Sequence, residues 1–326
     1  MLTELKFVQG AVAKKDYNPT LTHFEIKDKK IKGTNGSLTI CSPIALDIEA
    51  KPKALPFVKA IQSCKGNTVQ IHVTPTGRLS VKSGKFKSLI ECTTEDFPDI
   101  EPEGTWVSLT DTPILPALKK LLEFTAEDAS RPWALGVMFR GDKAFATNNI
   151  ILLEYSLGFK FPVEVNIPKF AVAEIVRVGK EPIGMMVTAT SVTFMYDQFT
   201  WIRTQLYQDD WPDVGKVLDR EVPYDPIPEN LFEDIEQISP FVDDTMRVIL
   251  KVGSVTTAQS DESSGATVEN LNIKHFGVFN FKQFMRLDGL VTEMSFASYP
   301  APCLFKGENV RGAFIGMRCD DLPQEV

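Results

Sequence analysis

The feature that most constrains this chain of 326 residues is an internal repeat. Its period is roughly 110 to 115 residues, and a missed repeat of this kind would misassign the whole fold. The clearest marker is Glu95-Asp96-Phe97-Pro98-Asp99, which returns as Asp209-Asp210-Trp211-Pro212-Asp213. An aromatic residue followed by proline suits a buried anchor where the chain leaves a strand. We therefore divide the chain into three copies of one unit, at 1–104, 105–220 and 221–326.

Each copy contains two segments in which apolar residues recur at helical spacing. The first segment opens the copy, and in the middle copy it follows Asp111-Thr112-Pro113, a cap and first-turn proline. Its apolar stripes are Leu2, Leu5, Val8 and Val12; Ile114, Leu118, Leu121 and Leu122; and Leu231, Ile235 and Ile238. The second segment lies within the copy, at Lys53–Cys64, Pro168–Val178 and Asn280–Leu290.

Between the helices the apolar period changes to two, which is typical of strands. Val69, Ile71 and Val73 alternate with polar residues before a turn at 74–77 leads into Leu79 and Val81. Similar patterns occur at 186–192, 194–202, 246–256 and 293–317. Gly33-Thr34-Asn35-Gly36 is read as a hairpin turn, and 259–266 as a polar surface loop. The predicted class is α+β, with two helices on antiparallel sheet in each copy.

The composition gives little sign of chemistry or of a membrane. No run of about 18 apolar residues is present, so we expect a cytoplasmic protein with no membrane partner. Five scattered cysteines and three isolated histidines suggest neither disulfides nor zinc. Phosphate-loop, dinucleotide and hydrolase motifs are absent from the sequence. We therefore expect no enzyme activity, no metal and no cofactor.

Basic residues cluster on the predicted helices although the formal net charge is −8. Such a surface could hold nucleic acid through its phosphates without reading bases. Each lysine could equally lie on the solvent-exposed face of an amphipathic helix, with no role in binding. The fifth helix is the exception, because Glu229, Glu233, Asp234 and Glu236 make it acidic.

These features resemble the bacterial-type beta sliding clamp, the beta subunit of DNA polymerase III. The matching motifs are Leu79-Ser80-Val81-Lys82-Ser83-Gly84, Arg131-Pro132-Trp133-Ala134-Leu135-Gly136-Val137, Ala146-Thr147-Asn148-Asn149, Trp211-Pro212-Asp213 and Gly316-Met317-Arg318. The resemblance implies a non-catalytic processivity factor: a head-to-tail homodimeric ring around double-stranded DNA. It also implies that DNA polymerase and clamp loader bind through short linear peptides.

The resemblance and the charge pattern together give three sets of candidate residues. The DNA-binding set is Lys14, Lys15, Lys59, Lys119, Lys120, Arg131, Trp133, Lys169, Arg177, Lys282 and Arg286. The peptide-pocket set is Ala134, Thr147, Asn149, Ile151, Leu152, Ile315, Met317 and Arg318. The dimer set is Phe86 and Leu89 on a strand near 85–91, with Leu271 and Ile273 on a strand near 267–274. Trp133 and the pocket and dimer residues could also be ordinary core residues.

Two departures from the family pattern stand out. Ile150-Ile151 replaces the usual His-Arg pair, which implies a different peptide specificity. Cys319–Val326 extends past the usual end of the family, and we expect this tail near the pocket. Both departures would suit a virus-encoded clamp, acting in a host cytoplasm, or an otherwise diverged one.

Two other functions remain open from the residues alone. A β-rich scaffold or virion protein would also carry repeats and exposed sheet edges. A metal-dependent nuclease could use Asp209, Asp210 and Asp213, although their place beside the repeated aromatic-proline motif favours a solvated turn.

Overall fold

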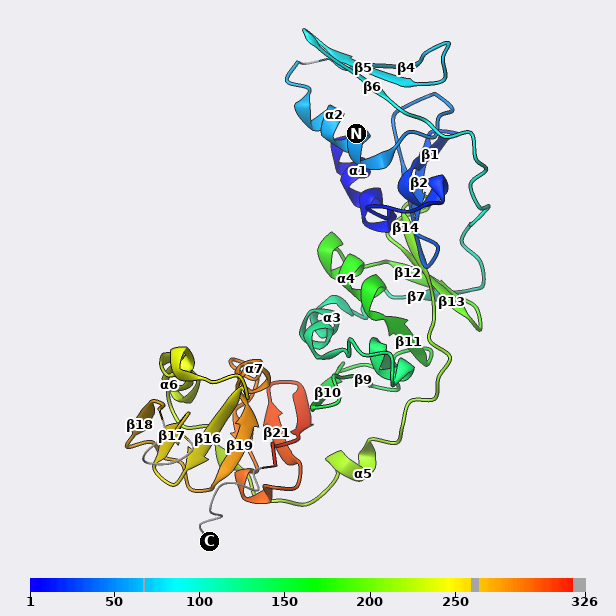
Figure 1. The fold of residues 1–326 in the computed structure, drawn as a ribbon. Helices are drawn as coiled ribbons and strands as arrows, with labels where there is room; N and C mark the ends of the chain where they lie inside the picture. Colours follow the sequence, from blue (N-terminus) through cyan, green and yellow to red (C-terminus); the bar gives the residue numbers. More distant parts are fainter. Residues whose placement is uncertain (67, 259–263, 319–326) are drawn as a thin grey trace. The chain divides into compact units, whose positions relative to one another are not determined.

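The chain forms two compact units in the computed structural model, which describes residues 1–66, 68–258 and 264–318 (Figure 1). Unit 1 comprises 1–119 and 165–208, and unit 2 comprises 120–164 and 209–326. Each unit therefore combines one terminal repeat with about half of the middle repeat. The repeat boundaries at 104/105 and 220/221 stay a prediction. The tail at 319–326, and most of the predicted loop at 259–266, lie outside the described residues.

Unit 1 places helices on a long antiparallel sheet whose strands follow the order β1-β2-β3-β14-β13-β12-β7. A second sheet has the order β4-β5-β6. The helical segments are α1 (Leu2–Val8), η1 (Gln9–Ala11), η2 (Pro19–Thr22), α2 (Ala54–Ser63) and α4 (Lys169–Val178). The strands are β1 (Phe24–Lys27), β2 (Lys30–Thr34), β3 (Leu38–Pro43), β4 (Gln70–Val73), β5 (Leu79–Ser83), β6 (Phe86–Ile90), β7 (Thr105–Ser108), β11 (Val165–Pro168), β12 (Gly184–Val187), β13 (Ser191–Met195) and β14 (Trp201–Gln205).

Unit 2 follows the same plan. One sheet contains the run β8-β9-β10-β22-β21-β20-β15, and a second has the order β18-β17-β16-β19. Its helical segments are η3 (Leu122–Phe124), η4 (Pro132–Leu135), α5 (Gly215–Leu218), α6 (Leu231–Gln237), η5 (Ser239–Phe241), α7 (Phe281–Met285) and η6 (Phe296–Ser298). Its strands are β8 (Gly136–Arg140), β9 (Lys143–Thr147), β10 (Ile151–Ser156), β15 (Asp225–Pro226), β16 (Arg247–Lys251), β17 (Ser254–Thr256), β18 (Thr267–Glu269), β19 (Gly277–Asn280), β20 (Glu293–Met294), β21 (Cys303–Gly307) and β22 (Val310–Phe314). The helix α3 (Leu115–Leu121) crosses the division between the units.

The predicted α+β class is confirmed, because every predicted helix and hairpin has a counterpart. The six predicted helices correspond to α1, α2, α3, α4, α6 and α7, although α1 and α7 are shorter than the periodicity suggested. The segment 33–36 links the antiparallel strands β2 and β3, as a hairpin turn should. Within unit 1, α1 packs against α2, and within unit 2, α6 packs against α7.

An aromatic cluster forms the centre of unit 2. The Phe279 ring on β19 lies 5.2 Å from Phe284 on α7 and 5.1 Å from Phe314 on β22, centroid to centroid. All three rings are fully buried. Because these residues come from both sheets and a helix, their packing joins the layers of the unit.

We predict that Phe279→Ala destabilises the protein by about 3 to 5 kcal/mol, because it leaves a cavity among three layers. Val252→Ala is the control, since Val252 is 75% exposed, and it should shift stability by less than about 0.5 kcal/mol. Urea unfolding followed by near-ultraviolet circular dichroism measures both. Equal midpoints for the two variants would contradict the assignment of this core.

Candidate functional site

A short loop in unit 1 displays two amines and an aromatic ring to solvent. Lys14, Lys15 and Tyr17 are all exposed, and Tyr17 reaches 106% of its reference area. The loop is closed at its base, because the Ala13 N–H donates to the Leu21 carbonyl at 2.8 Å. Asn18 caps the following turn by accepting from the Thr20 N–H at 3.1 Å. One backbone bond and one side-chain cap thus fix the loop, while its tip stays exposed to solvent.

The other residues of the predicted DNA-binding set lie mainly on the surface. Exposed members are Lys59, Lys119, Arg131, Arg177, Lys282 and Arg286, and half-buried members are Lys120, Trp133 and Lys169. The Lys120 ammonium stands 5.8 Å from the centre of the Tyr155 ring.

Arg177 makes structural contacts that the sequence did not reveal. Its guanidinium donates from α4 to the Lys6 carbonyl at 3.2 Å and to the Phe7 carbonyl at 2.9 Å. It also pairs with Glu174 at 2.6 Å. The two carbonyls belong to the end of α1, where backbone acceptors lack partners within the helix. Arg177 therefore caps α1, so only part of its donor capacity is available to DNA.

Arg286 also donates to a backbone carbonyl at the end of a helix, in unit 2. It donates from the end of α7 to the Glu123 carbonyl at 2.8 Å, just beyond α3. Arg131 instead donates to the Asn149 side chain at 3.1 Å, which brings a predicted DNA residue and a predicted pocket residue together.

Unit 2 carries an apolar surface built on two buried clusters. One cluster contains Met138, Phe145 and Trp211, and the other contains Leu218, Leu304 and Ala313. Five partly buried residues pack on these clusters, and we call them the Leu152 surface: Trp133, Leu152, Val214, Val222 and Tyr224. The Trp133 and Trp211 rings meet edge to face with centroids 4.9 Å apart. Trp133 is therefore a packing residue beside the predicted pocket, with part of its side chain exposed.

The predicted pocket residues do not all reach this surface. Ala134 and Ile151 are fully buried and Thr147 is buried, so these three support the surface from beneath. The Thr147 hydroxyl donates to the Ile151 carbonyl at 2.8 Å, which closes the turn before β10. Leu152 and Asn149 remain partly exposed.

The end of β22 brings further predicted residues to the same turn. The Ile315 N–H donates to the Ile150 carbonyl at 2.9 Å, and the Ile315 side chain is 49% exposed. Met317 belongs to another cluster, with Ile249, Val278, Phe276 and Tyr299. Arg318 is exposed. Sequence reasoning missed Val214, Val222 and Tyr224, although the repeated aromatic-proline motif directly precedes this connector.

Both strands predicted to close a dimer lie at the ends of sheets within the described residues. β6 ends the sheet β4-β5-β6, and β18 ends the sheet β18-β17-β16-β19. Leu89 on β6 is 51% exposed, and Phe86 is partly exposed. The predicted strand near 267–274 is shorter in the structure, because β18 ends at Glu269 and both Leu271 and Ile273 lie beyond it. Leu271 is partly exposed, but Ile273 is buried within its own unit. Phe86, Leu89 and Leu271 thus offer apolar surface near an unpaired strand edge.

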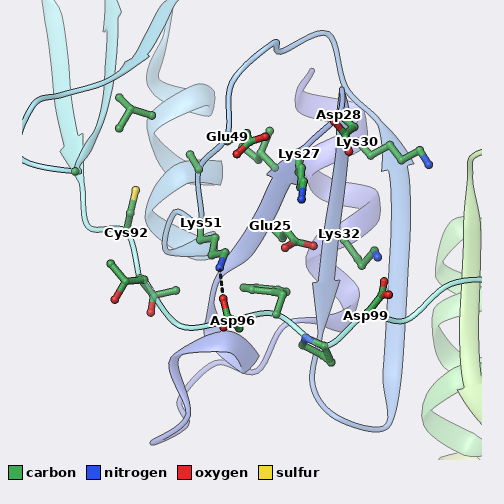
Figure 2. Close-up of a pocket in the computed structure, with 18 of the residues that line it drawn as sticks. Glu25, Lys27, Asp28, Lys30, Lys32, Glu49, Lys51, Cys92, Asp96 and Asp99 are labelled. Carbon is green, nitrogen blue, oxygen red and sulfur yellow. Dashed lines mark ion pairs between the residues drawn. The ribbon is translucent and has the colours of Figure 1, made fainter.

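A cleft of about 770 Å³ in unit 1 lies between β1, β2 and the connector at 92–101 (Figure 2). Its charges partly neutralise one another, because Lys32 pairs with Glu101 at 2.7 Å and Lys51 with Asp96 at 3.6 Å.

Burial raises the pKa of the Cys41 thiol in the adjacent sheet to about 11, and that of Cys303 in unit 2 to about 12. Both thiols are protonated at neutral pH and are poor nucleophiles.

The described residues contain no group of three or more His, Cys, Asp and Glu side chains that could hold a metal ion. Among the same residues, no helix has the length and apolar character needed to cross a membrane.

We predict that Arg177→Lys lowers the melting temperature by about 2 to 5 °C, because lysine keeps the charge but lacks the planar fork of N–H groups that reaches both carbonyls and Glu174 from separate nitrogens. Arg78→Lys is the matched control, since Arg78 is exposed in the β4–β5 turn. Differential scanning fluorimetry compares the two. Equal melting temperatures for Arg177→Lys and wild type would contradict the capping role.

The chain is similar to known proteins in its structure. No protein-family model matches the chain, and no curated protein does. Among solved structures, the beta sliding clamp of C. crescentus matches with a TM-score of 0.82 at 15% identity, covering 98% of this chain and 97% of that one. The DNA polymerase sliding clamp of Bacillus subtilis matches with a TM-score of 0.78 at 15% identity and the same coverage.

A third match is the sliding clamp of Pseudomonas aeruginosa bound to griselimycin, with a TM-score of 0.79, 16% identity and coverage of 98% and 97%. These similarities extend over nearly the whole length of each protein. The chain therefore has the fold of the bacterial beta sliding clamps.

Proposed function

We propose that this protein is a DNA sliding clamp that encircles duplex DNA and holds a polymerase on it. The observation that carries the proposal is the clamp fold over 98% of the chain. Fold alone does not give function, but three surface features support the same conclusion. They are the basic helices, the sheet edges and the Leu152 surface. The protein would act without catalysis or cofactor, in the cytoplasm of its cell or host.

DNA binding is proposed to run through lysines and arginines that contact phosphates. The helices α1, α2 and α4 of unit 1, and α7 of unit 2, carry or adjoin exposed basic residues. Binding of this kind is independent of base sequence and weakens steeply with salt. It suits a ring that must slide, because no base contact fixes its position.

Ring closure is proposed to join β6 of one chain to β18 of a second chain in a head-to-tail homodimer. Both strands end their sheets among the described residues, and Leu89 and Leu271 offer apolar contact beside them. A head-to-tail contact repeats at both interfaces, so two chains can close without an unused edge.

Partner binding is proposed at the Leu152 surface. Leucine, valine and tyrosine side chains there are only partly buried, and Ile315 lies close to the same turn. Apolar anchors of a short peptide from a polymerase or clamp loader would complete their burial. We assign the same surface to griselimycin on this chain, which makes that compound a probe of the site.

The decisive property of a clamp is topological retention on DNA. We predict that the protein, once loaded on nicked circular DNA, survives gel filtration with the circle in about 0.5 M salt, where phosphate contacts alone are weak. Cutting the circle once should release it. Equal retention on circular and linear DNA, or loss from both, would count against encirclement, and higher-order assembly without DNA dependence would favour a scaffold.

We further predict that Lys14→Gln with Lys15→Gln lowers the slope of log affinity against log salt by about 0.9 for each lysine that contacts a phosphate. Lys27→Gln with Lys29→Gln removes the same charge from the exposed β1–β2 turn and serves as the control. Fluorescence anisotropy on duplex DNA measures the slopes. Identical slopes for both pairs would show that the loop does not face DNA.

A further inference from the structure

The internal repeat places two equivalent turns at the starts of β3 and β10. In the first, the Thr34 hydroxyl donates to the Leu38 carbonyl at 3.1 Å. In the second, the Thr147 hydroxyl donates to the Ile151 carbonyl at 2.8 Å. In both, an asparagine side chain accepts from the backbone N–H three residues later at 2.8 Å. The two turns therefore match residue by residue.

This match continues into the sheets. Thr39 on β3 lies opposite Arg203 on β14, and Leu152 on β10 lies opposite Ala313 on β22. Counting from the matched turns, Thr39 is equivalent to Leu152, and Arg203 is equivalent to Ala313. Two residues further on, Gln205 is equivalent to Ile315.

The connectors that cross these sheets match as well. Each follows the aromatic-proline-aspartate motif, so Ile100 is equivalent to Val214, and Glu103 to Val217. Ile100 packs on Cys41, Met195 and Trp201 in unit 1. Val214 packs on Leu218, Leu304 and Ala313 in unit 2. Each unit therefore presents one copy of the same site, formed by a connector lying on a sheet.

The chemistry of the two copies is opposite. In unit 2 the equivalent positions are apolar: Leu152, Val217, Ala313 and Ile315. In unit 1 they are polar or charged: Thr39, Glu103, Arg203 and Gln205. These four line a cleft of about 350 Å³ beside the connector.

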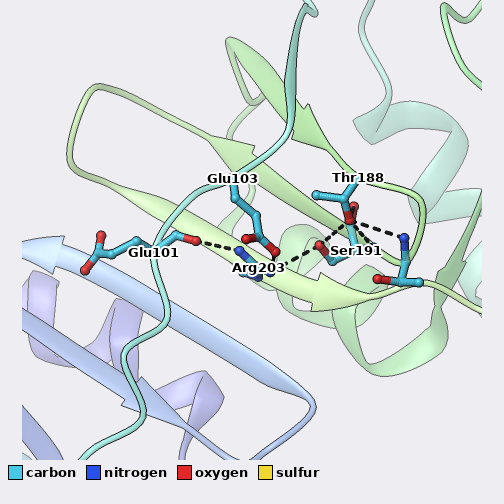
Figure 3. A network of polar contacts seen from close by, with 6 residues as sticks. Glu101, Glu103, Thr188, Ser191 and Arg203 are labelled. Atoms are coloured by element: carbon cyan, nitrogen blue, oxygen red, sulfur yellow. Dashed lines mark hydrogen bonds and ion pairs between the residues drawn. The ribbon is translucent and has the colours of Figure 1, made fainter.

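Arg203 occupies the unit 1 copy through one ion pair and two further hydrogen bonds (Figure 3). Its guanidinium donates to the Glu101 carbonyl at 2.5 Å, to the Ser191 hydroxyl at 3.3 Å and to the Glu103 carboxylate. The Arg203 side chain is only 12% exposed, whereas Glu103 is 60% exposed. Glu101 is held a second time, because its carboxylate pairs with the buried Lys32 at 2.7 Å.

We propose that Arg203 is a specificity-determining residue that closes the unit 1 copy to the apolar peptide taken by the unit 2 copy. The chain's own connector is the occupant, with Glu103 bound to Arg203 where a partner side chain would lie. An apolar anchor entering this cleft would break charge-assisted bonds and strand a largely desolvated guanidinium. The pairing thus directs partners to the Leu152 surface, and in this respect the inference rests on the proposed function.

The test opens the unit 1 copy by giving it the residues of unit 2, in the variant Thr39→Leu/Glu103→Val/Arg203→Ala. Native mass spectrometry counts the griselimycin molecules bound per chain. Leu152→Arg is the matched variant, and it should lose binding at the unit 2 copy. We expect one molecule per wild-type chain and two per opened chain. Two per wild-type chain, or still one per opened chain, would overturn the proposal.

A second readout needs no ligand and so separates this inference from the proposed function. In Arg203→Gln, amide hydrogen exchange at Ile100, whose N–H donates to the Pro98 carbonyl at 3.0 Å, should rise by about tenfold or more, because the connector loses its ion pair at Glu103 and a hydrogen bond at the Glu101 carbonyl. Lys65→Gln, at an exposed position just beyond α2, is the control and should leave the exchange unchanged. If griselimycin fails to bind wild type, the peptide site fails but the exchange result still stands. Unchanged exchange in Arg203→Gln would overturn the pairing itself.

Discussion

The structure depends on two backbone ladders that join consecutive repeats edge to edge. In unit 1, β3 pairs with β14 from Leu38↔Thr204 to Cys41↔Trp201. In unit 2, β10 pairs with β22 from Ile151↔Phe314 to Tyr155↔Val310. Each ladder turns two sheet edges from separate repeats into the interior of one sheet. A slip of one residue would turn buried side chains outward, so register is strongly fixed.

Side chains at these joins reinforce the ladders differently. At the unit 2 join, the buried Glu154 accepts from Arg311 across the pair at 2.8 and 3.0 Å, and from Lys143 at 3.1 Å. The two carboxylate oxygens are thus satisfied by charged donors, which a buried anion requires. At the unit 1 join, Cys41 and Trp201 pack under Ile100 instead. Each join therefore contains one charged and one apolar position, and these exchange places between the two units, which is how one repeat can supply different surfaces.

The fold was largely predictable from sequence because its signals are local and repeated. Helical spacing at 54–63 and 169–178, alternation at 70–73 and the turn at 33–36 each depend on neighbours along the chain. The site was less predictable. Burial of Ala134 and Ile151, capping by Arg177 and the Arg203–Glu103 pair depend on contacts between segments far apart in sequence. The spacing of residues along the chain does not predict which side of a turn faces solvent after two repeats have paired.

The central claim is that two copies of this chain close around duplex DNA, and an image of that complex tests it most directly. Electron cryomicroscopy of the protein loaded on circular DNA should show a closed ring of two chains, with duplex through the centre and β6 of each chain beside β18 of the other. Duplex lying against the outside of the protein, or an open assembly with β6 and β18 apart, would contradict the account.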